Sequence, residues 1–342
     1  MKIGTVGTNF IAVSFIEAAR QTGKVEILSC YSRKQETADA FAAVQGIPRS
    51  FSSRDAFLGD DSVDFIYIAA PNSLHFQWAG DALRAGRNVI CEKPFMSNGA
   101  EFQDIVDLAR ERGLFLFEAL TVPHLPNYRL IREKLPLLGP IRLVQLNFSQ
   151  YSSRYDAYLR GEDPNVFSPA FSGGALMDLN YYNLNFVTGL FGLPGSIRYF
   201  PNRGKNGIDT SGVLVMEYGG VVCTAAACKD SASPDFLQIQ GEKGYIHSSS
   251  TSSNLREGFT LHIGDSQEFF NLQKNTNVLY YEILDFAEAF AAGDRSLCEA
   301  PLEAGLQSAR LVDRARLDAG IRFPADDYRR ENGFSGREPS GD

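Results

Sequence analysis

The stretch Lys2-Ile3-Gly4-Thr5-Val6-Gly7-Thr8-Asn9-Phe10-Ile11-Ala12 decides the fold of this chain. The residues before Gly7 alternate as in a strand, and residues 10–21 then place apolar side chains at helical spacing. The turn between them stands where a G-x-G-x-x-G/A fingerprint lets the backbone approach a pyrophosphate at a helix N-terminus. Gly7 and Ala12 match that fingerprint, and Asn9, a residue type that tolerates left-handed backbone geometry, replaces its second glycine. The pattern indicates a dinucleotide-binding turn.

Strand-like and helix-like segments continue to alternate after this turn. The run 63–70 is almost continuously apolar, as expected of a strand that is buried on both faces. Alternation with short connections is typical of a doubly wound parallel sheet. We therefore expect residues 1–120 to form a Rossmann dinucleotide-binding domain. The further strands are expected at 25–31, 88–91 and 114–117, and the further helices at 34–45, 73–85 and 98–112.

The composition of the 342 residues is that of an ordinary globular protein, with 44% apolar and 22% charged residues. This length exceeds one ordinary core, so two domains are expected. A net charge of −8 without a basic stripe argues against a nucleic-acid partner. No apolar run reaches the roughly 18 to 20 residues of a membrane helix. No apolar leader with a small-residue cleavage site follows Met1.

Five cysteines and four histidines are scattered along the chain. Most of the cysteines sit in apolar runs, as buried free thiols do. Cys223 and Cys228 lie in one strand-like run with an odd spacing, so they face opposite sides and cannot hold one metal ion together. These observations predict a reduced, cytoplasmic protein with no metal site and no membrane attachment.

The end of the second strand should meet the adenosine ribose of a dinucleotide. An acidic residue there binds the 2′-hydroxyl of NAD(H), whereas a basic residue suits the 2′-phosphate of NADP(H). The chain has Ser32-Arg33-Lys34 at this point and no carboxylate before Glu36. We therefore expect NADP(H) to be preferred, with NAD(H) still possible. Alternatively, Arg33 and Lys34 start a solvated helix, and Arg33 can stack on the adenine of either cofactor.

The loop Ala69-Ala70-Pro71-Asn72-Ser73-Leu74-His75 follows the buried strand and is expected on the nicotinamide side of the crevice. Asn72 or Ser73 can also cap the next helix, and both roles can coexist. Together with Glu92 and Lys93 at the end of the following strand, the residues predicted to bind the cofactor are Gly7, Thr8, Asn9, Phe10, Ile11, Ser32, Arg33, Ala70, Pro71, Asn72 and His75.

The next strand, Val89-Ile90-Cys91-Glu92-Lys93-Pro94, stops at a charged pair and a proline. Proline cannot donate to a strand ladder and favours an extended backbone at the preceding residue. A lysine at the carboxyl end of a parallel strand can point into the ligand crevice of the sheet. Lys93 is thus a candidate catalytic residue. The alternative is that Glu92 and Lys93 are loop charges after a core strand, and for Glu92 a structural role is favoured.

Three motifs together resemble the Gfo/Idh/MocA oxidoreductase family. They are the G-T-x-x-I-A turn at Gly7–Ala12, the A-x-P-N-S-x-H loop at Ala69–His75, and the E-K-P strand end at Glu92–Pro94. The resemblance extends to Gly173–Asp178 and to Pro301–Pro324, so it covers nearly the whole chain except the last 15 or so residues. Within the family, the chain is most similar to the dimeric dihydrodiol dehydrogenase and sugar dehydrogenase branch.

The second half is expected to be an α+β domain over residues 121–327, followed by a polar tail at 328–342. Tight links such as Glu217-Tyr218-Gly219-Gly220-Val221 indicate an open, mostly antiparallel sheet. Residues 152–172 are expected to form a loop or lid. The apolar face of this sheet makes a homodimer in the resembled family; alternatively, the domain's own helices cover it. The expected strands are 141–151, 196–200, 211–218, 221–228, 235–240, 244–248, 259–263 and 267–271.

The helix expected from Gly173 to about Leu190 carries two candidate catalytic residues. Asp178 and Tyr182 are four residues apart and so share one helical face. Alternatively, Asp178 caps or pairs locally and Tyr182 is a packing residue. The resembled family has an aspartate here that is followed four residues later by histidine or, in some branches, tyrosine. The resemblance thus implies that both residues act on the substrate.

A hydride transfer at a carbinol carbon needs a group that takes or gives the hydroxyl proton. Tyr182 is expected in this role, with Lys93 as a cation that lowers the pKa of its phenol, although the two roles can be exchanged. Asp178 would orient the substrate or Lys93. The candidate substrate contacts are Arg154, Tyr155, Tyr158 and Asn185.

The sequence therefore predicts an NAD(P)-dependent oxidoreductase that acts on a CH–OH or C=O carbon of a sugar, polyol or cyclic trans-diol. A non-catalytic dinucleotide-binding sensor or regulator of the same fold is the alternative from another class. An imine or biliverdin-type reductase is the alternative among enzymes. A pure scaffold protein is disfavoured, because it would not need a phosphate-binding turn.

Overall fold

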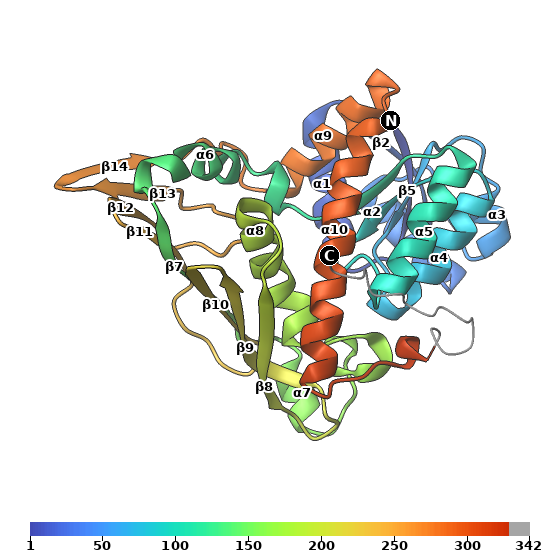
Figure 1. Cartoon of the computed structure of the whole chain (residues 1–342). Coiled ribbons are helices and arrows are strands. Elements are labelled where there is room, and N and C mark those ends of the chain that lie inside the picture. Colours follow the sequence, from blue (N-terminus) through green and yellow to red (C-terminus); the bar gives the residue numbers. More distant parts are fainter. Residues whose placement is uncertain (328–342) are drawn as a thin grey trace.

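A computed structural model of the chain describes residues 1–327, so the predicted polar tail at 328–342 lies outside the described residues. The first half forms a six-stranded parallel sheet with the order β3-β2-β1-β4-β5-β6 (Figure 1). The predicted Rossmann architecture is confirmed. The strands are β1 Lys2–Val6, β2 Glu26–Tyr31, β3 Arg49–Phe51, β4 Phe65–Ile68, β5 Asn88–Glu92 and β6 Leu116–Ala119.

The helices of this half follow the strands as the alternating pattern predicts. Every residue of the central strand β4 is buried, which explains its continuous apolar run. β3 and α3 were not predicted. The helices are α1 Phe10–Thr22, α2 Gln35–Gln45, α3 Arg54–Leu58, α4 His75–Arg84 and α5 Gly99–Arg112.

The second half forms an eight-stranded sheet with the order β14-β13-β12-β11-β7-β10-β9-β8. Adjacent strands in this sheet are antiparallel, as predicted, except that β7 and β10 run parallel. The strands are β7 Ile141–Ser149, β8 Ser196–Arg203, β9 Asp209–Tyr218, β10 Val221–Cys228, β11 Phe236–Gly241, β12 Gly244–Ser248, β13 Phe259–Ile263 and β14 Ser266–Phe270.

The helices of the second half connect the two sheets. α9 packs against α1, and α10 contacts α5 and β6 as well as α8 and β8. Buried apolar side chains between Leu279 and Ala309 belong to the hydrophobic core of the Rossmann sheet. The C-terminal helices therefore pack back onto the N-terminal domain. These helices are α6 Pro126–Lys134, α7 Tyr155–Leu159, α8 Tyr181–Phe191, α9 Leu279–Ala292 and α10 Ser296–Asp318, with a π-helix at Leu176–Asn180 before α8.

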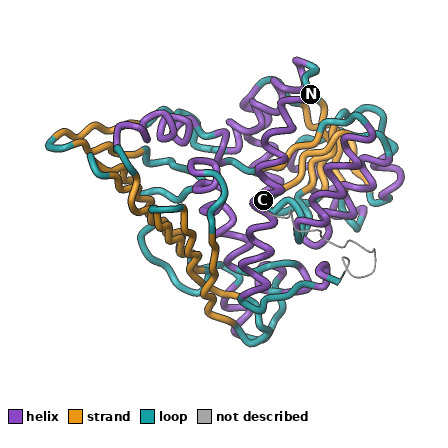
Figure 2. The backbone as a smooth tube through the Cα atoms, viewed as in Figure 1, coloured by secondary structure: helices purple, strands orange, loops and turns teal. Residues whose placement is uncertain are grey.

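One face of the second sheet is open within the described residues. Strand register puts Phe200, Val213, Val222, Tyr245 and Phe269 on the same face, and all five are exposed. The helices lie on the inner side of the sheet (Figure 2). The alternative that the domain's own helices cover this apolar face is therefore wrong for residues 1–327.

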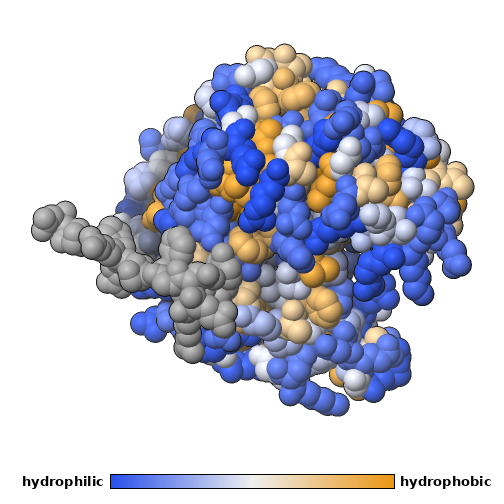
Figure 3. All heavy atoms as spheres, turned by 90° about the vertical axis from the view of Figure 1, so that its right-hand side faces the viewer, coloured by the Kyte–Doolittle hydropathy of each residue, from blue (hydrophilic) through white to orange (hydrophobic). Residues whose placement is uncertain are grey.

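The outer surface of the Rossmann domain is mainly hydrophilic, with scattered hydrophobic residues (Figure 3). Among residues 1–327, every helix is too short or too polar to cross a lipid bilayer.

Candidate active site

The predicted dinucleotide turn joins β1 to α1. Gly7 has φ +104°, and a Cβ atom there would lie 2.5 Å from the carbonyl oxygen of Ala69, so the turn requires glycine. Asn9 does not use the left-handed geometry that the sequence suggested. It is extended and caps α1 through Oδ1, which accepts from the Ala12 N–H at 3.1 Å. Its Nδ2 donates to the Ala69 carbonyl at 2.8 Å, which ties the turn to the end of β4.

The first turn of α1 fits a dinucleotide pyrophosphate. The leading N–H groups of a helix lack intrahelical partners and attract anions. The Thr8–Ile11 segment places such groups at the edge of the sheet, and no acidic residue stands in this first turn. The Phe10 side chain is 81% exposed and leaves the approach to the turn open.

The end of β2 carries the predicted ribose contacts. The Ser32 N–H donates to the Phe51 carbonyl at 3.1 Å and fixes the backbone there. Arg33 and Lys34 are exposed, and neither forms an ion pair with another described residue. Both cations can therefore meet a phosphate.

The loop after β4 is held by its own polar side chains. The buried His75 ring lies between the Ala70 carbonyl, 2.9 Å from Nε2, and the Pro94 carbonyl, 3.1 Å from Nδ1. Asn72 Nδ2 donates to the Ser172 carbonyl of the second domain at 2.9 Å. His75 and Asn72 thus shape the crevice, and their polar atoms are engaged with the protein. The predicted cap is wrong, since neither Asn72 nor Ser73 caps a helix; Ala70 and Pro71 are half-buried beside them.

Lys93 ends β5 and reaches across to the second domain. Its Nζ donates to Asp178 twice, at 2.9 Å to the carbonyl oxygen and at 3.1 Å to Oδ1. The same atom lies 4.4 Å from the centre of the Tyr182 ring. Burial opposes the charged amine, but Tyr182, Asp178 and Glu92 outweigh burial and raise the Lys93 pKa above its usual value. The structure brings the three predicted catalytic residues together.

A second buried lysine, which the sequence did not reveal, completes this cluster. Lys229 follows β10 and donates to Asp178 Oδ2, while its Nζ lies 5.2 Å from the Phe167 ring centre. Burial disfavours the Asp178 carboxylate, but Lys229 and Lys93 outweigh that effect and hold its pKa well below the usual range. The sequence feature that could have indicated Lys229 is its position as a charged residue directly after an apolar strand.

Tyr182 lies beyond the π-helix Leu176–Asn180 rather than in one continuous α-helix. It is half-buried, its ring is tilted against Phe148, and its hydroxyl has no hydrogen-bond partner among the described residues. Burial raises its pKa to about 12, although Lys93 lowers it. The expected net lowering is therefore wrong for the ligand-free protein, because the Lys93 ammonium lies over the ring face and is already paired with Asp178.

Glu92 ends β5 next to Lys93. Its side chain is buried and accepts a hydrogen bond from the Tyr67 hydroxyl at 2.7 Å. Its second oxygen accepts from the Lys93 N–H at 3.3 Å. Glu92 thus holds the end of β5, in agreement with the structural role that the sequence favours for it. Among residues 1–327, no cluster of three or more histidine, cysteine, aspartate or glutamate side chains could hold a metal ion.

The four candidate substrate contacts are not all at this site. Tyr158 is buried, and its hydroxyl donates to Asn206 at 2.9 Å, so packing explains it. Tyr155 packs on Phe167, the ring that also lies beneath Lys229, whereas Arg154 is exposed at the start of α7. Asn185 lies on a separate cavity, and its Nδ2 donates to the Tyr181 carbonyl at 2.8 Å.

Two family models match this chain. Residues 1–120 match the oxidoreductase family with an NAD-binding Rossmann fold, GFO_IDH_MocA. Residues 130–247 match the GFO/IDH/MocA C-terminal domain.

Similar proteins span the same length. The uncharacterized oxidoreductase YgjR of Escherichia coli is 39% identical over 328 residues, which are 95% of this chain and 98% of that protein. The scyllo-inositol 2-dehydrogenase (NADP(+)) IolU of Bacillus subtilis is 31% identical over 326 residues, 95% of this chain and 99% of that protein. The crystal structure of KijD10, a 3-ketoreductase from Actinomadura kijaniata in complex with NADP and TDP-benzene, shares the fold. Its TM-score is 0.82 at 23% identity, over 93% of this chain and 97% of that chain.

Proposed function

The chain belongs to the Gfo/Idh/MocA oxidoreductase family, and we propose that it transfers a hydride between NADP(H) and a CH–OH or C=O carbon of a sugar, inositol or other cyclic polyol, trans-diols included. The observation that carries this proposal is the meeting of Lys93, Asp178 and Tyr182 at the carboxyl edge of the Rossmann sheet. A protein that only senses a dinucleotide has no need of a proton donor in this place.

The side chains divide the chemistry among them. Bound NADP(H) would supply or accept the hydride. The Lys93 ammonium and the Tyr182 hydroxyl would both donate to the reacting oxygen of the substrate and stabilise the negative charge that develops there. Tyr182 is protonated in the ligand-free protein, because its pKa is raised to about 12 mainly by burial, so it begins reduction as the proton donor. Asp178 orients Lys93 and can accept a neighbouring substrate hydroxyl.

The exposed cations at the end of β2 support a preference for NADP(H) over NAD(H). Arg33 and Lys34 form no ion pair within residues 1–327 and can surround a 2′-phosphate. The Bacillus subtilis relative is a scyllo-inositol 2-dehydrogenase (NADP(+)), which agrees with this preference.

The open face of the second sheet supports a homodimer. Its exposed apolar side chains would be covered by the same face of a second copy, since a two-fold interface uses one patch twice. All five cysteines are free, which supports a reducing, cytoplasmic location.

The function is tested by incubating the purified protein and NADP⁺ with a panel of scyllo-inositol, myo-inositol, glucose and trans-1,2-cyclohexanediol. NADPH formation with at least one of these compounds is expected. NADPH binding without turnover of any member of a broad polyol panel, in either direction, would support the sensor instead.

A further inference from the structure

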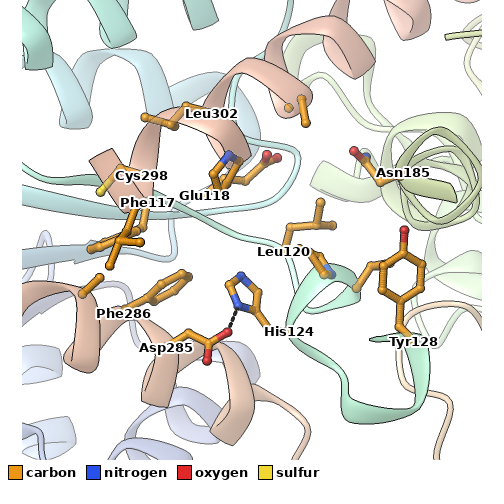
Figure 4. A pocket seen from close by; sticks show the side chains of 18 of the residues that line it. Phe117, Glu118, Leu120, His124, Tyr128, Asn185, Asp285, Phe286, Cys298 and Leu302 are labelled. Carbon is orange, nitrogen blue, oxygen red and sulfur yellow. Dashed lines mark hydrogen bonds and ion pairs between the residues drawn. The ribbon is translucent and has the colours of Figure 1, made fainter. Parts of the chain in front are cut away.

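A cavity of about 650 Å³ lies apart from the residues of the catalytic cluster (Figure 4). It is lined by β6, α6, α8, α9, α10 and the segment Val122–His124. Its size falls within the roughly 300–1,000 Å³ of small-molecule sites. Most of its wall is apolar, including Phe117, Leu120, Phe286, Leu297 and Leu302.

This cavity is distinct from the catalytic site but touches the same helix. Lys93, Asp178 and Tyr182 do not line it, whereas Asn185, Thr188 and Gly189 of α8 do. Because α8 also carries Tyr182, a molecule in the cavity would pack against the catalytic helix.

The carboxyl group of Glu118 stands out among the polar groups of the wall. Glu118 Oε1 accepts from the Tyr181 hydroxyl at 2.6 Å, and the other hydrogen bond to its carboxyl comes from the Phe95 backbone. Both donors are uncharged. No lysine or arginine forms an ion pair with Glu118 among the described residues. Lys93 acts on this carboxyl group without forming an ion pair with it, and burial outweighs that effect.

The other acids of the cavity are already neutralised. Asp285 pairs with His124 and Arg129, each at 2.5 Å, and Glu288 pairs with Lys24 at 2.7 Å. Glu118 is thus the acid of this wall that forms no ion pair within residues 1–327.

Asn185 supplies a second free acceptor. Its Nδ2 is occupied by the Tyr181 carbonyl, and its Oδ1 has no partner among the described residues. Figure 4 shows the side chains of Asn185 and Glu118 both projecting into the cavity. The wall therefore combines a large apolar surface with one acidic, hydrogen-bond-accepting end.

We propose that this cavity is a second ligand site, which takes a largely apolar molecule with one amino group. The ammonium group pairs with Glu118 and donates to Asn185 Oδ1, and the apolar body fills the space between α8, α9 and α10. An alcohol fills the same space without the ion pair, and a carboxylate meets like charge at Glu118.

The test uses three probes that differ only at one end: 4-phenylbutylamine, 4-phenylbutanol and 4-phenylbutyrate. Their affinities are measured by titration calorimetry on the NADP(H)-saturated protein near pH 8, where Glu118 is charged, since burial raises its pKa to about 7. The amine should bind about tenfold more tightly than the alcohol, as expected for one charge-assisted hydrogen bond, and the carboxylate should bind most weakly.

Matched variants locate the binding. Glu118→Gln keeps an acceptor for Tyr181, so it should reduce amine affinity to that of the alcohol and leave the alcohol unchanged. Ala304→Trp places an indole on the exposed rim of the cavity and should abolish binding of all probes. Tyr182→Phe should change none of the three affinities. The proposal is overturned if no probe binds, if the amine shows no advantage, if Glu118→Gln retains that advantage, or if Tyr182→Phe removes binding.

Discussion

Asp178 holds two ammonium groups at once, Lys93 through Oδ1 and Lys229 through Oδ2. The cluster therefore carries one net positive charge, which suits the developing negative charge on a substrate oxygen. Lys229 is buried and its amine donates to Asp178. We expect it to fix the carboxylate, so that the carboxylate in turn fixes Lys93.

Lys229→Met should lower kcat by on the order of 100-fold, because Asp178 would turn toward Lys93 and displace its amine from the reacting oxygen. Steady-state kinetics would show this loss mainly in kcat, with NADPH affinity unchanged. Lys24→Met, which removes an exposed ion pair with Glu288, serves as the control and should retain full activity. A folded Lys229→Met protein with normal kcat would show that the second lysine has no positioning role.

The residues of the catalytic cluster were predictable to different degrees. Lys93 was predicted because it stands at the end of a strand and before a proline. Asp178 and Tyr182 were predicted because their spacing matches a family motif. Lys229 could not be placed, since its contact with Asp178 spans 51 residues and depends on the pairing of β10 with β7. The Tyr182 pKa was misjudged because the sequence cannot show that the Lys93 amine lies over the ring.

At the scale of elements, the start of α2 is where cofactor choice is expected to be made. Arg33→Ala should weaken NADPH binding about tenfold, as expected for the loss of one charge-assisted contact to phosphate, and leave NADH binding nearly unchanged. Titration calorimetry with both cofactors measures the two affinities. The exposed Arg112, at the end of α5, provides a control variant, Arg112→Ala. Equal losses for NADPH and NADH would mean that Arg33 stacks on the adenine and does not select the phosphate.

The open sheet face gives a second test at this scale. Val213→Asp places a charge within the proposed dimer contact and should convert the dimer into a monomer. Light scattering coupled to size-exclusion chromatography measures the mass. Val44→Asp changes a more exposed valine on α2, away from the second sheet, and should leave the dimer intact. A wild-type monomer, or a dimeric Val213→Asp protein, would exclude this interface.

Most helices and strands were predictable, because periodic apolar residues and tight turns indicate them directly in the sequence. β3 and α3 span only Arg49–Phe51 and Arg54–Leu58, which is too short for a period to emerge. The π-helix at Leu176–Asn180 was read as ordinary helix, since its sequence has the same apolar spacing.

At the scale of the whole molecule, α10 ties the Rossmann core to the second sheet, and buried acids line this junction. Glu101 of α5 is buried near Asp313 of α10 and accepts from the Ser97 N–H at 3.1 Å. Burial raises its pKa to about 7. The folded state therefore binds a proton that the unfolded state releases at lower pH, so stability is greatest below the unfolded pKa and falls as pH rises toward 7.

The free energy of unfolding should consequently decrease between about pH 5 and pH 7. Glu101→Gln should reduce the slope of this free energy against pH by up to about 1.4 kcal/mol per pH unit. Urea unfolding at several pH values measures this dependence. Glu111→Gln, an exposed change on the same helix, should leave the slope unchanged. A slope of the same size in Glu101→Gln would assign the effect to other groups.

The most direct test of the catalytic account compares kcat and NADPH affinity in Tyr182→Phe, Lys93→Met and wild-type protein, with any substrate that the polyol panel identifies. Both variants should lose on the order of 10³-fold in kcat, since each removes a donor to the reacting oxygen, while NADPH affinity persists. Tyr218→Phe removes a hydroxyl on β9 that has no hydrogen-bond partner within residues 1–327, and it should keep wild-type kcat. Wild-type turnover in both catalytic variants would contradict the assignment of Lys93 and Tyr182 to proton transfer.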